Sequence, residues 1–413
     1  MTDEERRSLA QAFRRFRARR PVSVVVFSQA NLNAIDGSSV WVQTVTSALA
    51  GVRHVEVSTL LSHELTTDRI AGPLLANPGV TVIDPFGTQK QVSGARSLSL
   101  DEAAEILVRR ARRIDVLIVR GAEAADRLAG EPKLQGKLWP YLTDVPQRAE
   151  DIDDGWRDRL AHIMKASPIL LCQTEELRSF LESSFDSVAG KGRLLPPIVP
   201  DDVRPEYLPA PTREDLRLCY SGKFARHWNT YEMCELPAQL ADRGIQATLT
   251  MVGDKINQDP DWPEYMSLMR DRLESSPGVD WVGGVSRAES IAYMAGAHFG
   301  LSWRSRELDD SLELSTKLLE YCAAGTPPIV NRTAMHERVF GEGYGLFAST
   351  QTEVVDLLEA IVEQPGLYAR VISSVADISA GFTMTKASER LATIAGRTFP
   401  DMVAPGVEPE EHV

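Results

Sequence analysis

Two cations stand three residues apart directly after an apolar run. In "SGKFARHWN", Lys223 follows the run 216–222, and Arg226 precedes a helical pattern that begins at Asn229. The backbone amides at a helix N-terminus attract anions, so two cations beside such an end suit a diphosphate. Ordinary surface cations are the alternative interpretation. We expect Gly222, Lys223 and Arg226 to line an anion site.

A second segment, "LELSTKLLEYCAAGTPPIV" (312–330), places Glu320 inside a short apolar helix. Its neighbours are apolar, so this turn is expected to be buried, and a buried carboxylate needs hydrogen-bond partners. A vicinal diol such as a ribose would offer two hydroxyl donors, each worth about 1.5–3 kcal/mol to a charged acceptor. Ser315 or Thr316 would cap the helix and leave amides for a phosphate, and we include Lys317 in the same set. An exposed Glu320 is the alternative.

A third loop, "QANLNAIDGSS" (29–39), lies between the apolar run 22–28 and a helical pattern that ends at Ala50. Gly37 would allow the backbone to approach a ligand closely, and the amides around Ser38 would favour an anion. A structural turn glycine is the alternative.

The elements that must position these loops follow an alternating pattern. Apolar runs rich in β-branched residues predict buried parallel strands, and helical patterns such as 100–113 and 151–166 separate them. Strands that alternate with helices imply βαβ units, whose ligands bind beyond the carboxyl ends of the strands. The expected strands are 22–28, 80–84, 114–120, 168–173, 216–222, 245–253, 279–283, 298–303 and 327–330.

Two capping boxes predict where helices begin. Asn229 with Glu232 opens a helix expected over 229–244, which Pro237 would bend, and Ser286 opens a later helix in the same way. Six prolines between residues 196 and 211 form a connector that cannot continue a helix or a central strand. The 413 residues suit two domains, and we place their boundary in this connector.

The composition is that of a globular chain, with 43% hydrophobic and 25% charged residues. A net charge of −13 argues against nucleic acid as a partner. The four cysteines lack CxxC spacing and indicate buried, reduced thiols. No metal is expected, because the adjacent Asp pairs at 153–154 and 309–310 are common surface features. No apolar run approaches the ~20 residues of a membrane span, and no signal core follows the N-terminus, which favours a cytoplasmic protein.

The N-terminal residues 1–20 contain Leu9, Phe13 and Phe16 at helical spacing among seven arginines. We expect a solvated basic helix that packs a thin apolar stripe on its own domain. The alternative is a peripheral, weak contact of this amphipathic helix with an anionic membrane surface.

Taken in order, these segments resemble the retaining GT-B glycosyltransferases of group 1 (family 4-like), which include sucrose synthase and bacterial cell-envelope enzymes. The likeness covers most of residues 21–348. "LELSTKLLEYCAAGTPPIV" resembles the nucleotide-sugar signature, and "GFTMTKASERLATIAG" resembles the helix that crosses back to the first domain. The other matching segments are "NLNAIDGSSVWVQTVTSALA", "LLCQTEELRSFL" with "LLPPIVP", "LCYSGKFARHWNTYEM" and "VDWVGGVSRAESIAYMAGAHFGLSW".

The resemblance implies an α/β chain of GT-B class, with two Rossmann-like domains whose parallel sheets face an interdomain cleft. The expected parts are the basic helix (1–20), an acceptor-side domain (21–200), a nucleotide-sugar-binding domain (212–380), the helix that crosses back (381–398) and a flexible tail (399–413).

By position, the resemblance implies that Glu320 holds the ribose hydroxyls, that Lys223 meets the pyrophosphate and that the backbone near Gly284 meets the base. The chain also departs from the family. Many members have a second Glu eight residues before the ribose Glu, where this chain has Leu312, with Glu313 one place later. We keep Glu313 in the expected donor set.

Two further positions differ from the family pattern. A second basic residue usually follows the first by five positions, where this chain has Trp228, and we expect Arg226 to substitute. The first domain often supplies a His near the reacting sugar, but none occurs between His63 and His162. Asp144, in "YLTDVP", is our choice for that role.

The implied activity is a metal-independent, retaining transfer of a sugar from a nucleotide-diphosphate sugar, with a UDP-sugar favoured, to a hydroxyl of a glycan, lipid-linked or small-molecule acceptor. No cofactor besides this co-substrate is expected. Lys223 and Arg226 would stabilise the leaving diphosphate. A GT-B-type nucleotide-sugar epimerase, which would turn over donor without acceptor, is one alternative. A non-catalytic two-lobed sugar-binding protein is another, although it would normally carry an export signal.

Overall fold

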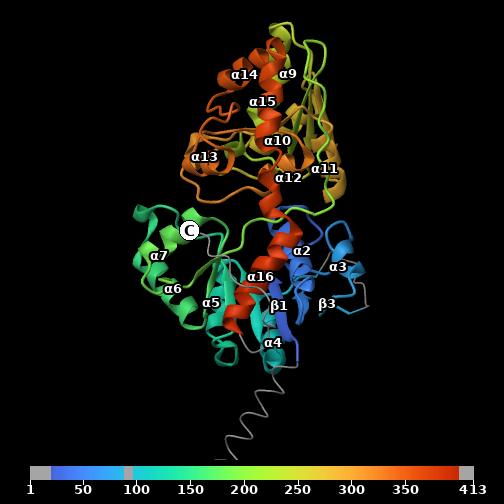
Figure 1. Ribbon diagram of the computed structural model, residues 1–413. Helices are drawn as coiled ribbons and strands as arrows, with labels where there is room; N and C mark the ends of the chain where they lie inside the picture. Colours follow the sequence, from blue (N-terminus) through green and yellow to red (C-terminus); the bar gives the residue numbers. More distant parts are fainter. Residues whose placement is uncertain (1–19, 88–95, 400–413) are drawn as a thin grey trace, which may run out of the picture. The chain divides into compact units, whose positions relative to one another are not determined.

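The computed structural model describes residues 20–87 and 96–399, which divide into two compact units (Figure 1). Unit 1 contains the described parts of Met1–Asn33, Ser38–Pro196 and Met384–Val413, and unit 2 contains Ala34–Gly37 and Pro197–Thr383. The expected basic helix, apart from residue 20, and the tail beyond residue 399 lie outside the described residues.

Within the described residues, unit 1 is built on a parallel sheet in the order β3-β2-β1-β4-β5-β6-β7. Its strands are β1 (Val22–Ser28), β2 (Val55–Leu60), β3 (Val80–Ile83), β4 (Val116–Arg120), β5 (Leu138–Tyr141), β6 (Leu170–Cys172) and β7 (Gly192–Leu194). Its helices are α2 (Gly37–Ala50), α3 (Gly72–Ala76), α4 (Leu100–Arg110), α5 (Ala122–Ala129), α6 (Asp154–Lys165), α7 (Glu175–Ser184) and α16 (Met384–Thr398). Ser388 in α16 donates a hydrogen bond to the carbonyl of Ala48 in α2, at 2.7 Å.

Unit 2 has a smaller parallel sheet in the order β10-β9-β8-β11-β12. Its strands are β8 (Leu216–Ser221), β9 (Ala247–Val252), β10 (Val279–Gly283), β11 (Phe299–Ser302) and β12 (Pro328–Val330). Its helices are α8 (Thr230–Met233), α9 (Leu236–Asp242), α10 (Tyr265–Ser275), α11 (Arg287–Ala295), α12 (Thr316–Ala324), α13 (Ala334–Phe340), α14 (Gln351–Glu363) and α15 (Pro365–Val375).

Both faces of the unit 2 sheet are covered, as parallel strands require. In β8 the side chains alternate, because successive residues of a strand point to opposite faces. Leu218 and Tyr220 join the large apolar cluster that includes α9, α10 and α14. Cys219, between them, joins the smaller cluster formed with α11 and α12. The apolar side chains of β8 therefore contribute to the core on both faces of the sheet.

The alternating pattern predicted the fold class correctly: both units are α/β with parallel sheets. β1 and β10 have the expected bounds. Three strands were not expected from the sequence, and each breaks the apolar pattern. Glu56 interrupts β2, Pro140 lies inside β5 where a missing N–H disfavours a central strand, and β7 has three residues. The four cysteines are buried and free, as expected.

The helix expected over 229–244 is instead divided into α8 and α9. Pro237 has no N–H to donate. In a continuous helix its ring would clash with the carbonyl four residues earlier, which belongs to Met233, the last residue of α8. Asn229 has a left-handed backbone (φ 51°) and its side chain caps nothing, so the first capping box was wrong. The second capping box, at Ser286, is confirmed.

No helix in the described ranges combines the length and the apolar character that crossing a membrane requires.

The hydroxyl of Tyr321 ties α12 to the edge of β8. It donates to the carbonyl of Cys219 at 3.0 Å and accepts from the amide of Ser221 at 3.1 Å, in a fully buried position. Gly300 in β11 passes beneath the ring, where a Cβ would lie 2.6 Å from it. The helix α12 is thereby fixed relative to the end of β8.

Replacing Tyr321 with Phe should lower the free energy of unfolding by about 1–3 kcal/mol, because two buried backbone groups lose their partner. The melting temperature of the purified chain measures this change. Tyr293→Phe is the matched control, since Tyr293 is 40% exposed. Equal melting temperatures of the two variants would contradict the assigned role of the hydroxyl.

Candidate functional site

The carboxyl edge of the unit 2 sheet brings together residues that are distant in sequence. Lys223 follows β8, and Arg304 follows its neighbour β11. The turn after β8 is built on Gly222 (φ 140°), and a Cβ on Gly253, after β9, would lie 2.1 Å from the carbonyl oxygen of Gly222. Because only glycine adopts these φ values readily, the backbone can turn sharply beside the two cations.

Three cations surround the indole of Trp228. The distances to its ring centroid are 4.9 Å from Lys317 Nζ, 5.8 Å from Lys223 Nζ and 5.9 Å from Arg304 Cζ. Lys317 Nζ also lies 4.1 Å from the ring centroid of Tyr220. We call Lys223, Arg304 and Lys317 the cation cluster. Trp228 belongs to a short 3-10 turn, η4 (Arg226–Trp228). The aromatic faces attract the cations, but they carry no negative charge that would neutralise them.

Lys317, in the first turn of α12, is the most perturbed member of the cluster. Burial, followed by the neighbouring charges of Lys223 and Arg304, lowers its pKa from 10.5 to about 7. Glu320, one turn further along α12, acts in the opposite direction but less strongly. A lysine with this pKa exchanges its proton near neutral pH.

Arg304 was not expected from the sequence. It is 4% exposed, and burial lowers the pKa of its guanidinium. The side chain of Asn331, at the end of β12, holds the Arg304 backbone by accepting from its amide at 2.8 Å and donating to its carbonyl at 2.9 Å. The nitrogens Nε and Nη2 have no hydrogen-bond partner.

Arg226, the second cation expected at the anion site, lies in the same turn η4. Its Nη1 is 3.7 Å from a carboxylate oxygen of Asp259, whose side chain is buried. That acid compensates part of its charge. The role of Arg226 at a diphosphate remains a prediction.

The N-terminus of α12 adjoins the cation cluster through Lys317. Ser315 occupies the N-cap position but its side chain makes no cap hydrogen bond. The cap expected of Ser315 is therefore wrong in this conformation, and its hydroxyl leaves the first amides of the helix, those around Thr316, uncapped. Glu313, just before the helix, lies near Arg304 and raises its pKa slightly against the effect of burial.

Glu320 is buried, as expected, with 9% exposure. Its Oε1 accepts a hydrogen bond from Arg287 Nε at 2.7 Å, and this ion pair is nearly inaccessible to water. Arg287 also donates from Nη2 to the carbonyl of Ile198 at 2.9 Å. Arg287 is therefore the partner that burial of this carboxylate requires, and one oxygen is engaged. The ribose contact stays a prediction.

Gly284, expected near the base, follows β10. A Cβ there would lie 2.2 Å from Asp254 Oδ2, so the backbone at this position is closely packed by the loop after β9.

In unit 1, the carboxyl edge places Gly37 and Ser38 at the start of α2. Arg120, the last residue of β4, donates to Ser38 Oγ at 2.7 Å, and its guanidinium lies 5.9 Å from the centroid of the Trp41 ring. Asp144 is exposed in the loop after β5. The catalytic role of Asp144 remains a prediction.

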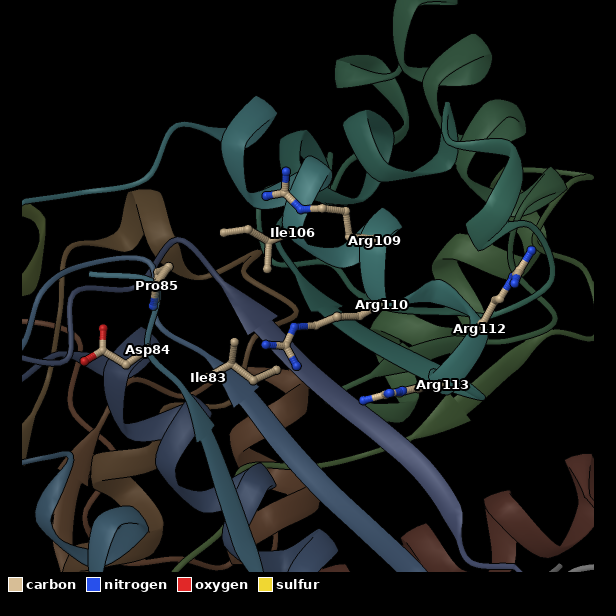
Figure 2. Close-up of a pocket in the computed structure, with 8 residues that line it drawn as sticks. All are labelled: Ile83, Asp84, Pro85, Ile106, Arg109, Arg110, Arg112 and Arg113. Atoms are coloured by element: carbon tan, nitrogen blue, oxygen red, sulfur yellow. The ribbon is translucent and has the colours of Figure 1, made fainter. Parts of the chain in front are cut away.

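A cavity of about 670 Å³ lies in unit 1, and none of the expected site residues lines it (Figure 2). It is lined by Ile83, Asp84, Pro85, Ile106, Arg109, Arg110, Arg112 and Arg113. The arginines are exposed, and Arg109 pairs with Glu105 at 3.5 Å. Cations at the last turn of a helix also complement its dipole, so we assign no site to this cavity.

Two of the site residues that were not expected from the sequence occupy a recognisable position. Arg304 and Arg120 are the first cations after, or at the end of, a buried apolar strand, which is the position that identified Lys223. Arg287 has no such signal, because it is the first residue of α11 and reaches Glu320 only through the fold. Within residues 20–87 and 96–399, no group of three or more His, Cys, Asp or Glu is arranged to hold a metal ion.

Comparison with known structures defines the class of fold. The chain has the GT-B fold: HepE of Anabaena, solved with UDP-glucose, has a TM-score of 0.67 with 11% identity over 91% of this chain and 99% of that chain. Sucrose-phosphate synthase of Thermosynechococcus elongatus has a TM-score of 0.64 with 13% identity over 92% and 100%. WaaG, a glycosyltransferase involved in lipopolysaccharide biosynthesis, has a TM-score of 0.58 with 15% identity over 93% and 100%.

In sequence, residues 232–392 match the family described as "Glycosyl transferase-like". The resemblance to GT-B glycosyltransferases inferred from the motifs is therefore confirmed. No curated protein sequence matches the chain.

The lowered pKa of Lys317 predicts a pH dependence of stability. Above about pH 7 folded Lys317 is neutral, whereas the unfolded chain keeps its proton up to about pH 10.5. The unfolded state then binds more protons, so stability should rise with pH across this window. Between pH 6.5 and 9, wild type should gain on the order of 1–2 kcal/mol relative to Lys317→Met, measured by urea denaturation without ligand. The exposed Lys133→Met should follow wild type, and parallel curves for all three proteins would refute the assignment.

Proposed function

We propose that the protein is a glycosyltransferase that moves a sugar from a nucleotide-diphosphate sugar, with a UDP-sugar favoured, to a hydroxyl acceptor in glycan, cell-envelope or glycoconjugate biosynthesis. The observation that carries the proposal is the cation cluster, in which three basic side chains gather at the carboxyl edge of a parallel sheet beside an uncapped helix N-terminus. The UDP and UDP-glucose complexes of HepE support the choice of donor.

The charge of the cluster suits the reaction. Departure of a nucleoside diphosphate builds negative charge on its terminal phosphate, and fixed cations and amide dipoles stabilise that charge without reorganising. Lys223 and Lys317 supply the cations, with the first amides of α12 as additional donors. Groups of this kind can take the place of a metal ion, so we propose a metal-independent reaction.

The remaining donor contacts follow from the elements around the cluster. Glu320 lies one turn beyond Lys317 on α12, where its second oxygen can accept from a ribose hydroxyl, while Arg287 holds the first. The backbone around Gly284 borders the base. Glu313 would contact the transferred sugar, and the contact of Gly37 and Ser38 with the donor phosphates stays a prediction.

Retention of configuration is part of the proposal. We assign no enzymic nucleophile, so the acceptor hydroxyl attacks on the face that the leaving group departs from. The acceptor's proton passes to the leaving phosphate oxygen as the new glycosidic bond forms and the sugar–phosphate bond breaks. Asp144 is proposed to act near the reacting sugar, and Arg226 to assist at the diphosphate.

The proposed donor site predicts nucleotide-dependent stabilisation. UDP or a UDP-sugar at about a hundred times its dissociation constant should stabilise the chain by roughly 2.7 kcal/mol, which a thermal-shift assay measures. Lys223→Ala should weaken UDP binding by about tenfold or more, because a charge-assisted contact is lost. Lys133→Ala, an exposed lysine of unit 1, is the control. If no nucleoside diphosphate or its sugar stabilises wild type, the proposed function is wrong.

The proposed ribose contact has its own test. Glu320→Gln should reduce the affinity for UDP by about tenfold, and the penalty should shrink for 2′-deoxy-UDP, which offers one hydroxyl fewer. Isothermal titration calorimetry with the two ligands measures both effects. Glu289→Gln, an exposed glutamate on α11, provides the comparison. A loss of equal size for both nucleotides would assign Glu320 a structural role through Arg287 alone.

A further inference from the structure

The guanidinium of Arg304 is held in an unusual state for a buried cation. The residue is 4% exposed, yet Nε and Nη2 are shielded from water and have no hydrogen-bond partner. Leaving buried charged donors without acceptors is costly. A structural arginine would be expected to satisfy them with carbonyls or a carboxylate.

The two nitrogens without partners form one edge of the guanidinium. Nε–H and one N–H of Nη2 point in parallel, and this fork matches the two oxygens of a phosphate or a carboxylate. The distance between these two N–H groups suits two oxygens of one oxyanion better than two acceptors from separate residues. A lysine could supply the charge at this position but not the fork.

The surrounding acids do not fill this role. Burial lowers the pKa of Arg304, and Asp309 and Glu313 lie near enough to oppose this effect in part, but neither accepts a hydrogen bond from Nε or Nη2. Asp309 is engaged by Asn331, whose Nδ2 donates to it at 2.8 Å. The same Asn331 side chain fixes the Arg304 backbone. The backbone of Arg304 is therefore held in place, while the Nε–Nη2 edge of its guanidinium stays unused.

We propose that Arg304 is a further ligand-binding residue, which takes an oxyanion bidentately through Nε and Nη2. In the donor, this oxyanion is either the terminal phosphate of the diphosphate or a carboxylate on the transferred sugar, and in this form the inference rests on the proposed function. Arg304 then supplies a basic side chain in addition to Lys223 and Arg226. It comes from β11 rather than from the loop after β8.

The test compares Arg304→Met and Arg304→Lys with Arg306→Met and Arg306→Lys, since Arg306 is exposed two residues away. Isothermal titration calorimetry uses UDP, UDP-glucose, UDP-glucuronate, uridine and inorganic pyrophosphate. Melting temperatures are recorded without ligand.

Arg304→Met and Arg304→Lys should both bind the ligand whose oxyanion Arg304 recognises about tenfold or more weakly than wild type, because neither Met nor Lys has the two parallel N–H donors of arginine. Arg304→Met should melt no lower than wild type, because a buried charge without acceptors is removed, and the Arg306 variants should match wild type in both measurements.

The ligands distinguish the two sources of the oxyanion. Weaker binding of UDP and pyrophosphate assigns Arg304 to the phosphate, whereas a loss confined to UDP-glucuronate assigns it to a sugar carboxylate. Unchanged affinities with a lowered melting temperature of Arg304→Met would make Arg304 structural and overturn the inference, while the proposed function would stand. Wild type that binds pyrophosphate through Arg304 but no nucleotide would support the inference and refute the proposed function, and wild type that binds none of the ligands would refute both.

Discussion

Concentrated positive charge is the constraint on which the second unit depends. Lys223, Lys317 and Arg304 all lie within 6 Å of the centroid of one indole ring. No two of them can then be more than about 12 Å apart, and at an effective dielectric of about 20 each pair repels by about 1 kcal/mol or more. Burial is the main reason that the pKa of Lys317 is low, and repulsion by Lys223 and Arg304 lowers it further, because releasing the proton relieves part of this repulsion. A net charge of −13 for the whole chain makes the local accumulation more pronounced.

The fold maintains this arrangement with groups that carry no charge of their own. Tyr321 fixes α12 to β8, and Asn331 fixes the end of β11 to the end of β12, so that Lys317 and Arg304 approach from different elements. Glycines at 222 and 253 allow the loops after β8 and β9 to pass close to each other. The stability of the apolar layers on both faces of the sheet offsets the cost of bringing the cations together. A site of this kind trades stability for affinity, as strained functional sites commonly do.

The sequence was informative where one local rule governed the outcome. A continuous apolar run identified β1 to the residue, and the segment 279–283 gave the bounds of β10 although it contains Asp280. The strand expected over 216–222 located Lys223 at the end of β8. Local pattern did not predict β5, because Pro140 disfavours a strand. The segment becomes a strand only because it pairs with β4 and β6 in the folded sheet. Burial of Glu320 could be predicted from its apolar neighbours. Its partner Arg287 could not, since it is 33 residues away and the ion pair exists only after α11 packs on α12.

This ion pair also explains why Glu320 does not pair with the cluster. Glu320 follows Lys317 by three residues on one helix, a spacing at which acid and base commonly pair. A salt bridge between them would neutralise Lys317 and reduce the attraction of the cluster for an anion. Instead, Glu320 pairs with Arg287, which a further hydrogen bond ties to the carbonyl of Ile198. Arg287 therefore separates an acid from the cations beside it, so that one helix can present a positive side chain and, one turn later, a hydrogen-bond acceptor.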